Sequence, residues 1–466
     1  MAKITFYGAA REVTGSCYLL DNGRDKILLD CGMHQGGDAT DRLEKESFGF
    51  DPKSLNAVVL SHAHLDHSGL LPRLVNGGFS GPIYCTEGTR QLLRILLEDA
   101  ANIYFRDLDY DNQVRRRAGK RVKPARYTPD DVRQVLNGCH ALDYHQREAV
   151  AAGFELCFHD AGHILGSSIV ELTIDDGGRK KTLVFSGDLG NPETSLMNHY
   201  EYLDNADLVL LESTYGDRDH RASDETLEEF RRILEQAREE GGNIMIPSFA
   251  VGRTQELLFH LGLFYQEGIL DDWQVFLDSP MGHAVTSLYA SYARFLDPED
   301  VATITRNGDR APTAFLPNLT ITESVEDSIA INKIKQGVII IAGSGMCTGG
   351  RIRHHLKHRL WDRRNHLVFV GFQAVDTLGR IIVDGVKKVK IYGQWIAVKA
   401  QIHTLGGFSA HAGQGDLVDW ISHFRSKPRV CLVHGEPDTM AVLQAKLGRE
   451  RGIKTHIPAI GDSLEF

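Results

Sequence analysis

Short apolar runs separated by glycine, polar or acidic turns dominate the first half of the chain. Examples are KITFYG, GSCYLL, KILLD, NAVVLS, SSIVELTI and KTLVFSGD, whose lengths and bounding turn residues are typical of β-strands. The clearest helical pattern in this half is TRQLLRILLEDAANIYF, at residues 89–105. A half so rich in strands predicts sheet packed on sheet, with helices outside.

Near residue 214 the pattern changes to alternating helix and strand, as in SDETLEEFRRILEQAREEG, NIMIPSF, RTQELLFHLGLFYQEG, WQVFLDS and GVIIIAG. This alternation predicts a second, α/β domain with a largely parallel sheet. The tail holds a strand-like RVCLVHGE, a helix DTMAVLQAKLGRE and a final KTHIP, too little for a domain of its own. We therefore predict a first domain at residues 1–213, completed by residues 406–466, with a second domain inserted at residues 214–405.

The composition is that of an ordinary globular protein. The chain has 466 residues, enough for two domains, of which 42% are apolar and 24% charged. No apolar run approaches the roughly 20 residues that span a bilayer, and the start MAKITFYGAA lacks the pattern of a signal peptide. The seven cysteines are odd in number and scattered, which indicates reduced thiols. We expect a cytoplasmic protein that does not bind a membrane.

One short stretch, HAHLDH at residues 62–67, concentrates residues that bind metals. It follows the buried strand pattern NAVVLS, at a point where turns can aim several side chains together. His62 and His64 alternate along an extended segment and share one side, while Asp66 and His67 follow around the turn. Imidazole nitrogens and carboxylate oxygens suit zinc, which binds about four ligands. The alternative is an exposed, histidine-rich turn.

Three further residues stand at the ends of predicted strands. His163 in DAGHILGSS precedes a strand, Asp188 in VFSGDLGN follows one, and His434 in CLVHGE ends another. Each alone is weak evidence, because a single histidine is more often a structural group than a ligand and Asp before Gly is common in turns. Together with HAHLDH they supply five imidazoles and two carboxylates, so a metal site is the better interpretation.

These motifs, taken in order, resemble the metallo-β-lactamase fold. LLDCG with Asp30 is similar to the first motif of that superfamily. LLESTYGD, GGFSAHAG and LVHGE resemble the three motifs of its β-CASP branch, the nucleic-acid-processing nucleases. The match runs from Asp30 to Glu436 and implies an α/β fold, a metallo-β-lactamase αββα sandwich with an inserted α/β β-CASP domain.

The resemblance implies a centre of two zinc ions. His62, His64 and His163 would hold one zinc, Asp66, His67 and His434 a second, and Asp188 would bridge the two. Asp30 would orient a ligand histidine by binding its other ring nitrogen, the alternative being a turn or helix cap. His434 favours RNA as substrate, because the DNA-repair members tend to have valine at this position.

Phosphodiester hydrolysis is the chemistry that such a centre would serve. Two cations can activate a shared water and neutralise the charge on a phosphoryl group, and Asp66 and Asp188 would enter catalysis by holding them. His411 is similar to the family's candidate proton donor, and Glu212 would orient it or tune its pKa. The alternatives are a strand-end turn for Glu212 and an ordinary helix residue for His411. Some members carry an acid where this chain has Gly413, a departure that leaves the metal ligands and the donor intact.

Several polar positions in the predicted insert are candidates for phosphate binding. The glycine-rich GSGMCTGGR precedes a basic helix, so Ser344, Thr348 or Arg351 could contact phosphate. Arg253 begins a helix in PSFAVGRTQELL and is a similar candidate. The alternatives are a solvated basic helix and a helix cap. Residues 113–126 carry seven Lys or Arg residues, either an entrance for RNA or solvated surface, while a net charge of −10 excludes indiscriminate binding over the whole protein.

The function expected is that of a zinc-dependent ribonuclease, an endonuclease, a 5′-exonuclease or both, in RNA processing or decay. Single-stranded RNA is the expected partner, and a homodimer is left open. One alternative is a non-catalytic RNA-binding scaffold, although such relatives should have lost ligands and this chain keeps all seven. Another is a small-molecule hydrolase of the same superfamily, against which stands the long insert between Asp188 and His411.

Overall fold

Two β-sheets face each other in the first of two units formed by the chain. The computed structural model describes residues 2–34, 43, 47–305, 308–371, 373–374 and 376–466. Unit 1 comprises Met1–Pro192, His199–Asp219 and His411–Phe466, and unit 2 comprises Glu193–Asn198 and His220–Ala410. Nothing in the sequence pattern indicated that residues 193–198 pack with unit 2. The division into domains at residues 213 and 405 stays a prediction.

The first sheet of unit 1 has the strand order β22-β1-β2-β3-β4-β5-β6 in the described part of the chain. Its strands are β1 (Lys3–Gly8), β2 (Cys17–Asp21), β3 (Lys26–Leu29), β4 (Ala57–Val59), β5 (Ile83–Thr86), β6 (Cys139–Leu142) and β22 (Ser463–Glu465). β1 pairs antiparallel with β22 and β2, as β2 does with β3, whereas β3 to β6 pair in parallel. β4, which leads into the HAHLDH stretch, therefore lies between two parallel neighbours.

The second sheet has the order β21-β20-β11-β10-β9-β8-β7 over the same described residues. Its strands are β7 (Arg147–Ala151), β8 (Phe154–Asp160), β9 (Ser168–Asp176), β10 (Arg179–Phe185), β11 (Leu208–Glu212), β20 (Arg429–Val433) and β21 (Thr455–His456). β10, β11 and β20 are parallel neighbours. β8 runs in the same direction, because two antiparallel pairings separate it from β10. The carboxyl ends of these four strands therefore lie along one edge of the sheet.

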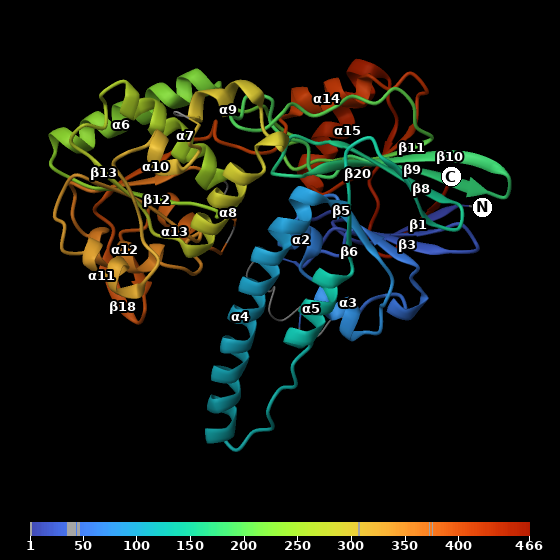
Figure 1. Cartoon of the computed structure of the whole chain (residues 1–466), viewed down its shortest axis with the longest axis horizontal. Helices are drawn as coiled ribbons and strands as arrows, with labels where there is room; N and C mark the ends of the chain where they lie inside the picture. The colour runs from blue at the N-terminus through green and yellow to red at the C-terminus, as the bar shows by residue number, and fades with distance from the viewer. Residues whose placement is uncertain (1, 35–42, 44–46, 306–307, 372, 375) are drawn as a thin grey trace. The chain divides into compact units, whose positions relative to one another are not determined.

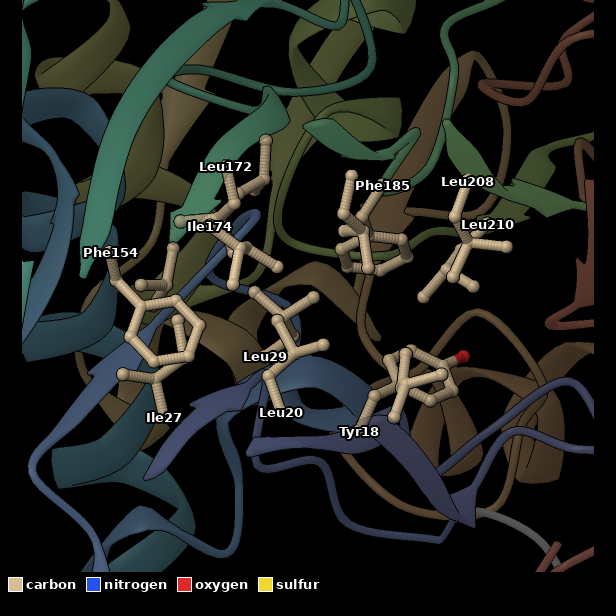
Figure 2. Close-up of a cluster of buried hydrophobic side chains, with 14 of the residues drawn as sticks. Tyr18, Leu20, Ile27, Leu29, Phe154, Leu172, Ile174, Phe185, Leu208 and Leu210 are labelled. Carbon is tan, nitrogen blue, oxygen red and sulfur yellow. The ribbon is translucent and has the colours of Figure 1, made fainter. Parts of the chain in front are cut away.

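The apolar faces of the two sheets form a common core (Figure 2). The first sheet contributes Tyr18, Leu20, Ile27 and Leu29, and the second contributes Phe154, Leu172, Ile174, Phe185, Leu208 and Leu210. The rings of Tyr18 and Phe185 meet edge to face, with centroids 5.4 Å apart. Alternate residues of each strand point into this layer, as the strand period requires. The predicted packing of sheet on sheet is confirmed.

Helices cover the outer faces of both sheets in unit 1 (Figure 1). The helices of unit 1 are η1 (Pro52–Ser54), α2 (Leu65–Ser68), α3 (Leu71–Asn76), α4 (Glu87–Arg117), whose far half extends beyond the sheets, α5 (Pro129–Asn137), α14 (Gln414–Ser422) and α15 (Pro437–Arg451). Trp420 of α14 and Leu443 of α15 are fully buried in one cluster with Leu432 of β20. With the two sheets, these helices complete the predicted αββα layering.

Helix α4 continues to Arg117, well beyond the end predicted at residue 105. The apolar period stops near residue 105, so the pattern gave no sign of the distal turns. The returning chain packs along the helix, and Tyr127 stacks on Tyr104, at the end of the predicted part, with centroids 4.7 Å apart. Asn112 also exchanges two hydrogen bonds with the backbone of Lys123. The predicted end was wrong because tertiary contacts, rather than an apolar face, stabilise this part of the helix.

Unit 2 is built on a six-stranded parallel sheet with the order β14-β13-β15-β12-β16-β19 among the residues described. Its strands are β12 (Ile244–Pro247), β13 (Gln274–Leu277), β14 (Leu319–Ile321), β15 (Val338–Ala342), β16 (His366–Phe369) and β19 (Gln401–Thr404). β17 (Lys388–Ile391) and β18 (Gln394–Ala397) form a separate antiparallel pair. The alternating pattern predicted this parallel sheet correctly.

The helices of unit 2 alternate with its strands. They are α6 (Ser223–Glu239), α7 (Arg253–Gln266), α8 (Pro280–Ser291), η2 (Ala293–Phe295), α9 (Pro298–Ile304), α10 (Pro312–Phe315), α11 (Val325–Ile331), α12 (Ile352–Arg359) and α13 (Leu378–Val383). In neither unit does a helix of the described chain combine the length and apolarity needed to cross a bilayer.

Replacing Phe185 with alanine is expected to destabilise unit 1 by about 3–5 kcal/mol, because the buried ring would leave a cavity between the sheets. Urea unfolding followed by circular dichroism measures the change. Tyr110→Ala is the matched control, since Tyr110 is 70% exposed on α4, and it should change stability by less than about 0.5 kcal/mol. Equal losses in the two variants would contradict the assignment of the core.

Candidate metal centre

The seven predicted ligands follow strands of both sheets. His62 and His64 come after β4, His163 after β8, Asp188 after β10 and His434 after β20, while Asp66 and His67 lie in α2. Asp66 and His67, predicted to follow around a turn, lie in a single helical turn that starts directly after His64. All seven belong to unit 1, and the aligned strand ends bring them together.

One group of donors consists of His62, His64, His163 and Asp188. Nε2 of His62 lies 3.1 Å from Nδ1 of His64, which lies 3.3 Å from Nε2 of His163. Oδ2 of Asp188 lies 3.4 Å from Nε2 of His62 and 3.7 Å from Nε2 of His163. Bonds of about 2.0–2.1 Å from zinc to nitrogen would place tetrahedral ligands roughly 3.3–3.4 Å apart. The four donors are therefore spaced as one tetrahedral ion requires.

A second group consists of Asp66, His67 and His434. Nε2 of His67 lies 3.2 Å from Nε2 of His434, which lies 3.7 Å from Oδ2 of Asp66. Oδ1 of Asp188 lies 3.4 Å from Nε2 of His67, so the two oxygens of Asp188 face different groups. This oxygen is buried and has no hydrogen-bond partner in the described part of the chain. The residues present thus fit a pair of cations with Asp188 between them.

Asp30 orients the ring of His67 by binding its Nδ1. Its Oδ2 lies 2.7 Å from Nδ1 of His67 and accepts hydrogen bonds from the hydroxyls of Ser16 and Ser61. Its Oδ1 accepts the backbone N–H of Ser61 at 2.8 Å. With Nδ1 engaged in this way, Nε2 of His67 is the nitrogen that faces His434. The carboxylate thus orients the ring in the manner expected of a metal-binding histidine.

The electrostatics favour the metal-binding forms of three of these side chains. Burial lowers the pKa of His62 well below its usual value, and it also lowers the pKa of His64. Burial alone would raise the pKa of Asp188, but His434 and His67 hold it well below its usual range. Neutral imidazoles and an ionised carboxylate are the forms that bind metals. His67 is the exception, because burial would lower its pKa but Asp188 and Asp30 raise it well above its usual value, so a bound metal would displace its proton.

His411 stands beside the first donor group. Its ring centroid lies 4.5 Å from that of His163, and its Nδ1 lies 3.5 Å from Oε1 of Glu212 and 4.0 Å from Oδ2 of Asp188. Burial acts to lower the pKa of His411, but the carboxylates of Glu212 and Asp188 outweigh it and raise the pKa to about 9. A ring that is protonated at neutral pH can act as an acid.

Glu212 is fixed at the end of β11, fully buried. Its Oε1 accepts the backbone N–H of Leu189 at 2.7 Å, and its Oε2 accepts that of Thr214 at 3.3 Å.

Thr214 is a residue of the site that was not predicted from the sequence. Its Oγ1 lies 3.2 Å from Nδ1 of His434, and its place in the LLEST motif was the available signal. Thr214 therefore orients the ring of His434 through Nδ1, as Asp30 orients the ring of His67.

The two predicted phosphate-binding arginines have partners within unit 2. Arg351 donates to Oδ1 of Asp278 and to the backbone carbonyl of Glu323, both at 2.7 Å. Arg253 is buried at the start of α7, where it pairs with Glu256. Both guanidinium groups thus contribute to the packing of the unit. Their contact with a substrate stays a prediction.

The two predicted hydroxyl groups lie together in the loop that follows β15. Oγ of Ser344 is 3.3 Å from Oγ1 of Thr348, and Ser344 also accepts the backbone N–H of Gly349. Two hydroxyls at this distance can both contact one phosphate group. This role, too, stays a prediction.

The αββα layers and the converging histidine and carboxylate donors define a metal-dependent hydrolase. Three family models match the chain: the metallo-beta-lactamase superfamily at residues 10–139, the Beta-Casp domain at 254–382, and the Zn-dependent metallo-hydrolase RNA specificity domain at 395–458. The chain belongs to the β-CASP branch of the metallo-β-lactamase superfamily. The resemblance seen in the sequence motifs is confirmed.

Individual relatives cover nearly the whole chain. Ribonuclease TTHA0252 of Thermus thermophilus is 41% identical over 463 residues, which is 99% of each protein. Transcription termination factor FttA of Methanocaldococcus jannaschii is 30% identical over 99% of this chain and 71% of its own length. A solved structure of a protein of unknown function from Enterococcus faecalis matches with a TM-score of 0.55 and 14% identity over 99% of both chains, which shows the fold alone.

Asp30→Asn is expected to weaken metal binding by about 10- to 100-fold, because it removes the carboxylate that holds Nδ1 of His67. Competition with a chromophoric chelator measures the affinity for zinc. Ser16→Ala removes one hydrogen bond to Asp30 but keeps its charge, so it should lose less affinity. An Asp30→Asn protein that binds zinc as tightly as wild type would rule out the orienting role.

Proposed function

We propose that this hydrolase is a zinc-dependent ribonuclease that cleaves RNA phosphodiester bonds with two metal ions. The observation that carries the proposal is the position of Asp188, whose two oxygens face two separate donor groups beside His411. The match to an RNA specificity domain and the similarity to a ribonuclease support RNA as the substrate.

The proposed ligands divide between two ions. His62, His64 and His163 would hold one zinc, Asp66, His67 and His434 the other, and Asp188 would contact both. Bound there, the ions would lower the pKa of a shared water and neutralise charge on a phosphoryl group. Zinc is proposed because it accepts this mixture of imidazole and carboxylate ligands in tetrahedral geometry. Asp66 and Asp188 serve catalysis through the ions that they hold.

His411 is the proposed general acid. It donates a proton to the 3′ oxygen as that oxygen leaves phosphorus, so the products carry a 5′-phosphate and a 3′-hydroxyl. Glu212 positions the ring through its Nδ1 and favours the protonated form. Asp30 and Thr214 orient the ligand histidines from outside the metal set.

The substrate proposed is single-stranded RNA, cut internally, from the 5′ end, or in both ways. Ser344 and Thr348 would contact a phosphate of that RNA through their adjacent hydroxyls. We place the activity in the cytoplasm, where seven free and buried cysteines would stay reduced.

Removal of metal is expected to abolish RNA cleavage, and zinc should restore it, because the proposed nucleophile and the charge neutralisation both require the ions. A gel assay with end-labelled RNA measures cleavage before chelation, after it and after addition of zinc. His64→Ala should eliminate cleavage while RNA binding, measured by fluorescence anisotropy, is retained. Cleavage that survives chelation or this substitution would refute the two-metal mechanism.

His411→Ala is expected to lower kcat by about 100- to 10,000-fold with little change in KM, the usual loss on removing a general acid. Glu212→Gln should act in the same direction but less strongly, because it perturbs the acid without deleting it. His423→Ala, an exposed histidine at the end of α14, is the control and should leave kcat unchanged. Metal content should match wild type in all three variants, since none of them alters a proposed ligand.

A further inference from the structure

A second cluster of histidine and carboxylate side chains lies on the outer side of the second sheet in unit 1. It contains His145 in the turn before β7, His159 on β8, Glu171 on β9 and Glu201 in the segment before β11. His145, His159 and Glu201 each offer one ligand atom, and these atoms lie within 4.8 Å of one another. The proposed ribonuclease mechanism uses none of these residues.

Glu201 presents one carboxylate oxygen to both rings. Its Oε2 lies 2.8 Å from Nε2 of His145 and 3.7 Å from Nδ1 of His159. Its Oε1 accepts the backbone N–H of Asp160 at 2.9 Å, and its own N–H donates to the carbonyl of Asp160. The indole of Trp420 donates to the carbonyl of Glu201. The backbone and one oxygen are thus fixed, which leaves Oε2 directed at the two histidines.

His159 is oriented by a carboxylate on its other nitrogen. Its Nε2 lies 2.8 Å from Oε2 of Glu171, whose Oε1 lies 3.2 Å from Nη2 of Arg147. Both His159 and Glu171 are only 15% exposed, so this ion pair is largely shielded from solvent. A carboxylate behind a histidine is the arrangement that prepares the opposite ring nitrogen for a metal. In His159 that opposite nitrogen is Nδ1, which faces Glu201.

The charges around the cluster favour a cation. Glu171 and Glu201 carry two negative charges, and Arg147 balances one of them. With neutral histidines the cluster keeps one surplus negative charge, which attracts a cation. A divalent ion supplies the missing positive charge more completely than a proton does.

We propose that His145, His159 and Glu201 form an additional zinc-binding site, separate from the catalytic centre, with Glu171 orienting His159. Two imidazoles and one carboxylate are a ligand set that zinc accepts, and solvent would complete the coordination. The observed separations of 2.8 and 3.7 Å bracket the roughly 3.3–3.4 Å expected between ligands of a tetrahedral ion. The Nδ1 proton of His159 would pass to solvent when the ion binds.

Such an ion would join three segments of unit 1. His145 lies in a turn and donates its N–H to the carbonyl of Phe158, His159 lies near the carboxyl end of β8, and Glu201 lies in the chain that leads to β11. Of the three ligands His145 is the most accessible, with a side chain that is 62% exposed. The ion would therefore enter from solvent and bind the turn to the sheet.

Zinc stoichiometry tests the proposal. Wild type, His145→Gln and Glu201→Gln are equilibrated by dialysis against the same micromolar free zinc, and the zinc per chain is measured by inductively coupled plasma mass spectrometry. Wild type should retain one ion more than either variant. His456→Gln, which alters an exposed histidine on β21, is the matched control and should retain the wild-type number. Equal zinc in wild type and both cluster variants overturns the proposal.

Two further measurements show whether the variants fold normally and whether the zinc that they lose comes from the proposed additional site rather than from the catalytic centre. All variants should keep the wild-type circular dichroism spectrum and the wild-type rate of RNA cleavage, because none of them alters the proposed catalytic set. Cobalt(II) added to wild type should give one more increment of visible absorption than it gives with Glu201→Gln. The difference between variants does not depend on what the catalytic centre cleaves, so its absence would refute this site alone. Failure of all RNA cleavage would refute the proposed ribonuclease alone.

Discussion

The common direction of β8, β10, β11 and β20 is the constraint on which the candidate site depends. Because these strands point the same way, His163, Asp188, Glu212 and His434 all emerge at one edge of the second sheet. The first sheet adds its ligands through Ser61, whose carbonyl accepts the N–H of Ser168 at 2.8 Å. The distance between the ligands that follow the first sheet and those that follow the second therefore depends on the apolar core between the sheets. The hydrogen bond between Ser61 and Ser168 fixes the two sheets to each other beside the site.

The two buried aspartates of the site, Asp30 and Asp188, differ in how their carboxylates are paired. Asp30 is fully buried, and every contact of its carboxylate with Ser16, Ser61 and His67 is a hydrogen bond or an ion pair. Asp188 is equally buried, yet its Oδ1 has no hydrogen-bond partner in the described chain. Its charge is offset by the surrounding histidines, His67 and His434 among them, rather than by hydrogen bonds to Oδ1. Asp30 is thus held by hydroxyl and backbone groups and supports one histidine, whereas the oxygens of Asp188 face both proposed donor groups.

Much of the fold and of the site could be predicted from the sequence. The strand pattern gave the packed sheets, the alternation of helix and strand gave the parallel sheet of unit 2, and the ordered motifs gave the residues that the structure brings together at the site. What the sequence could not show depends on partners distant along the chain. The backbone of Lys123 stabilises the far turns of α4 through its hydrogen bonds with Asn112. Asp278 engages Arg351, whose contact with phosphate stays a prediction. The pairing of Thr214 with His434 joins residues that are separated in sequence by the His220–Ala410 part of unit 2.

The position of β20 has a consequence for how the protein is made. The donors begin at His62 and end at His434, so the set cannot assemble until translation has passed nearly the whole of the described chain. β20 then has to pair with β11, a strand synthesised long before it. β22, which completes the first sheet beside β1, is synthesised later still. A chain that ends before β20 therefore contains the strands of unit 2 but lacks His434 of the proposed metal centre.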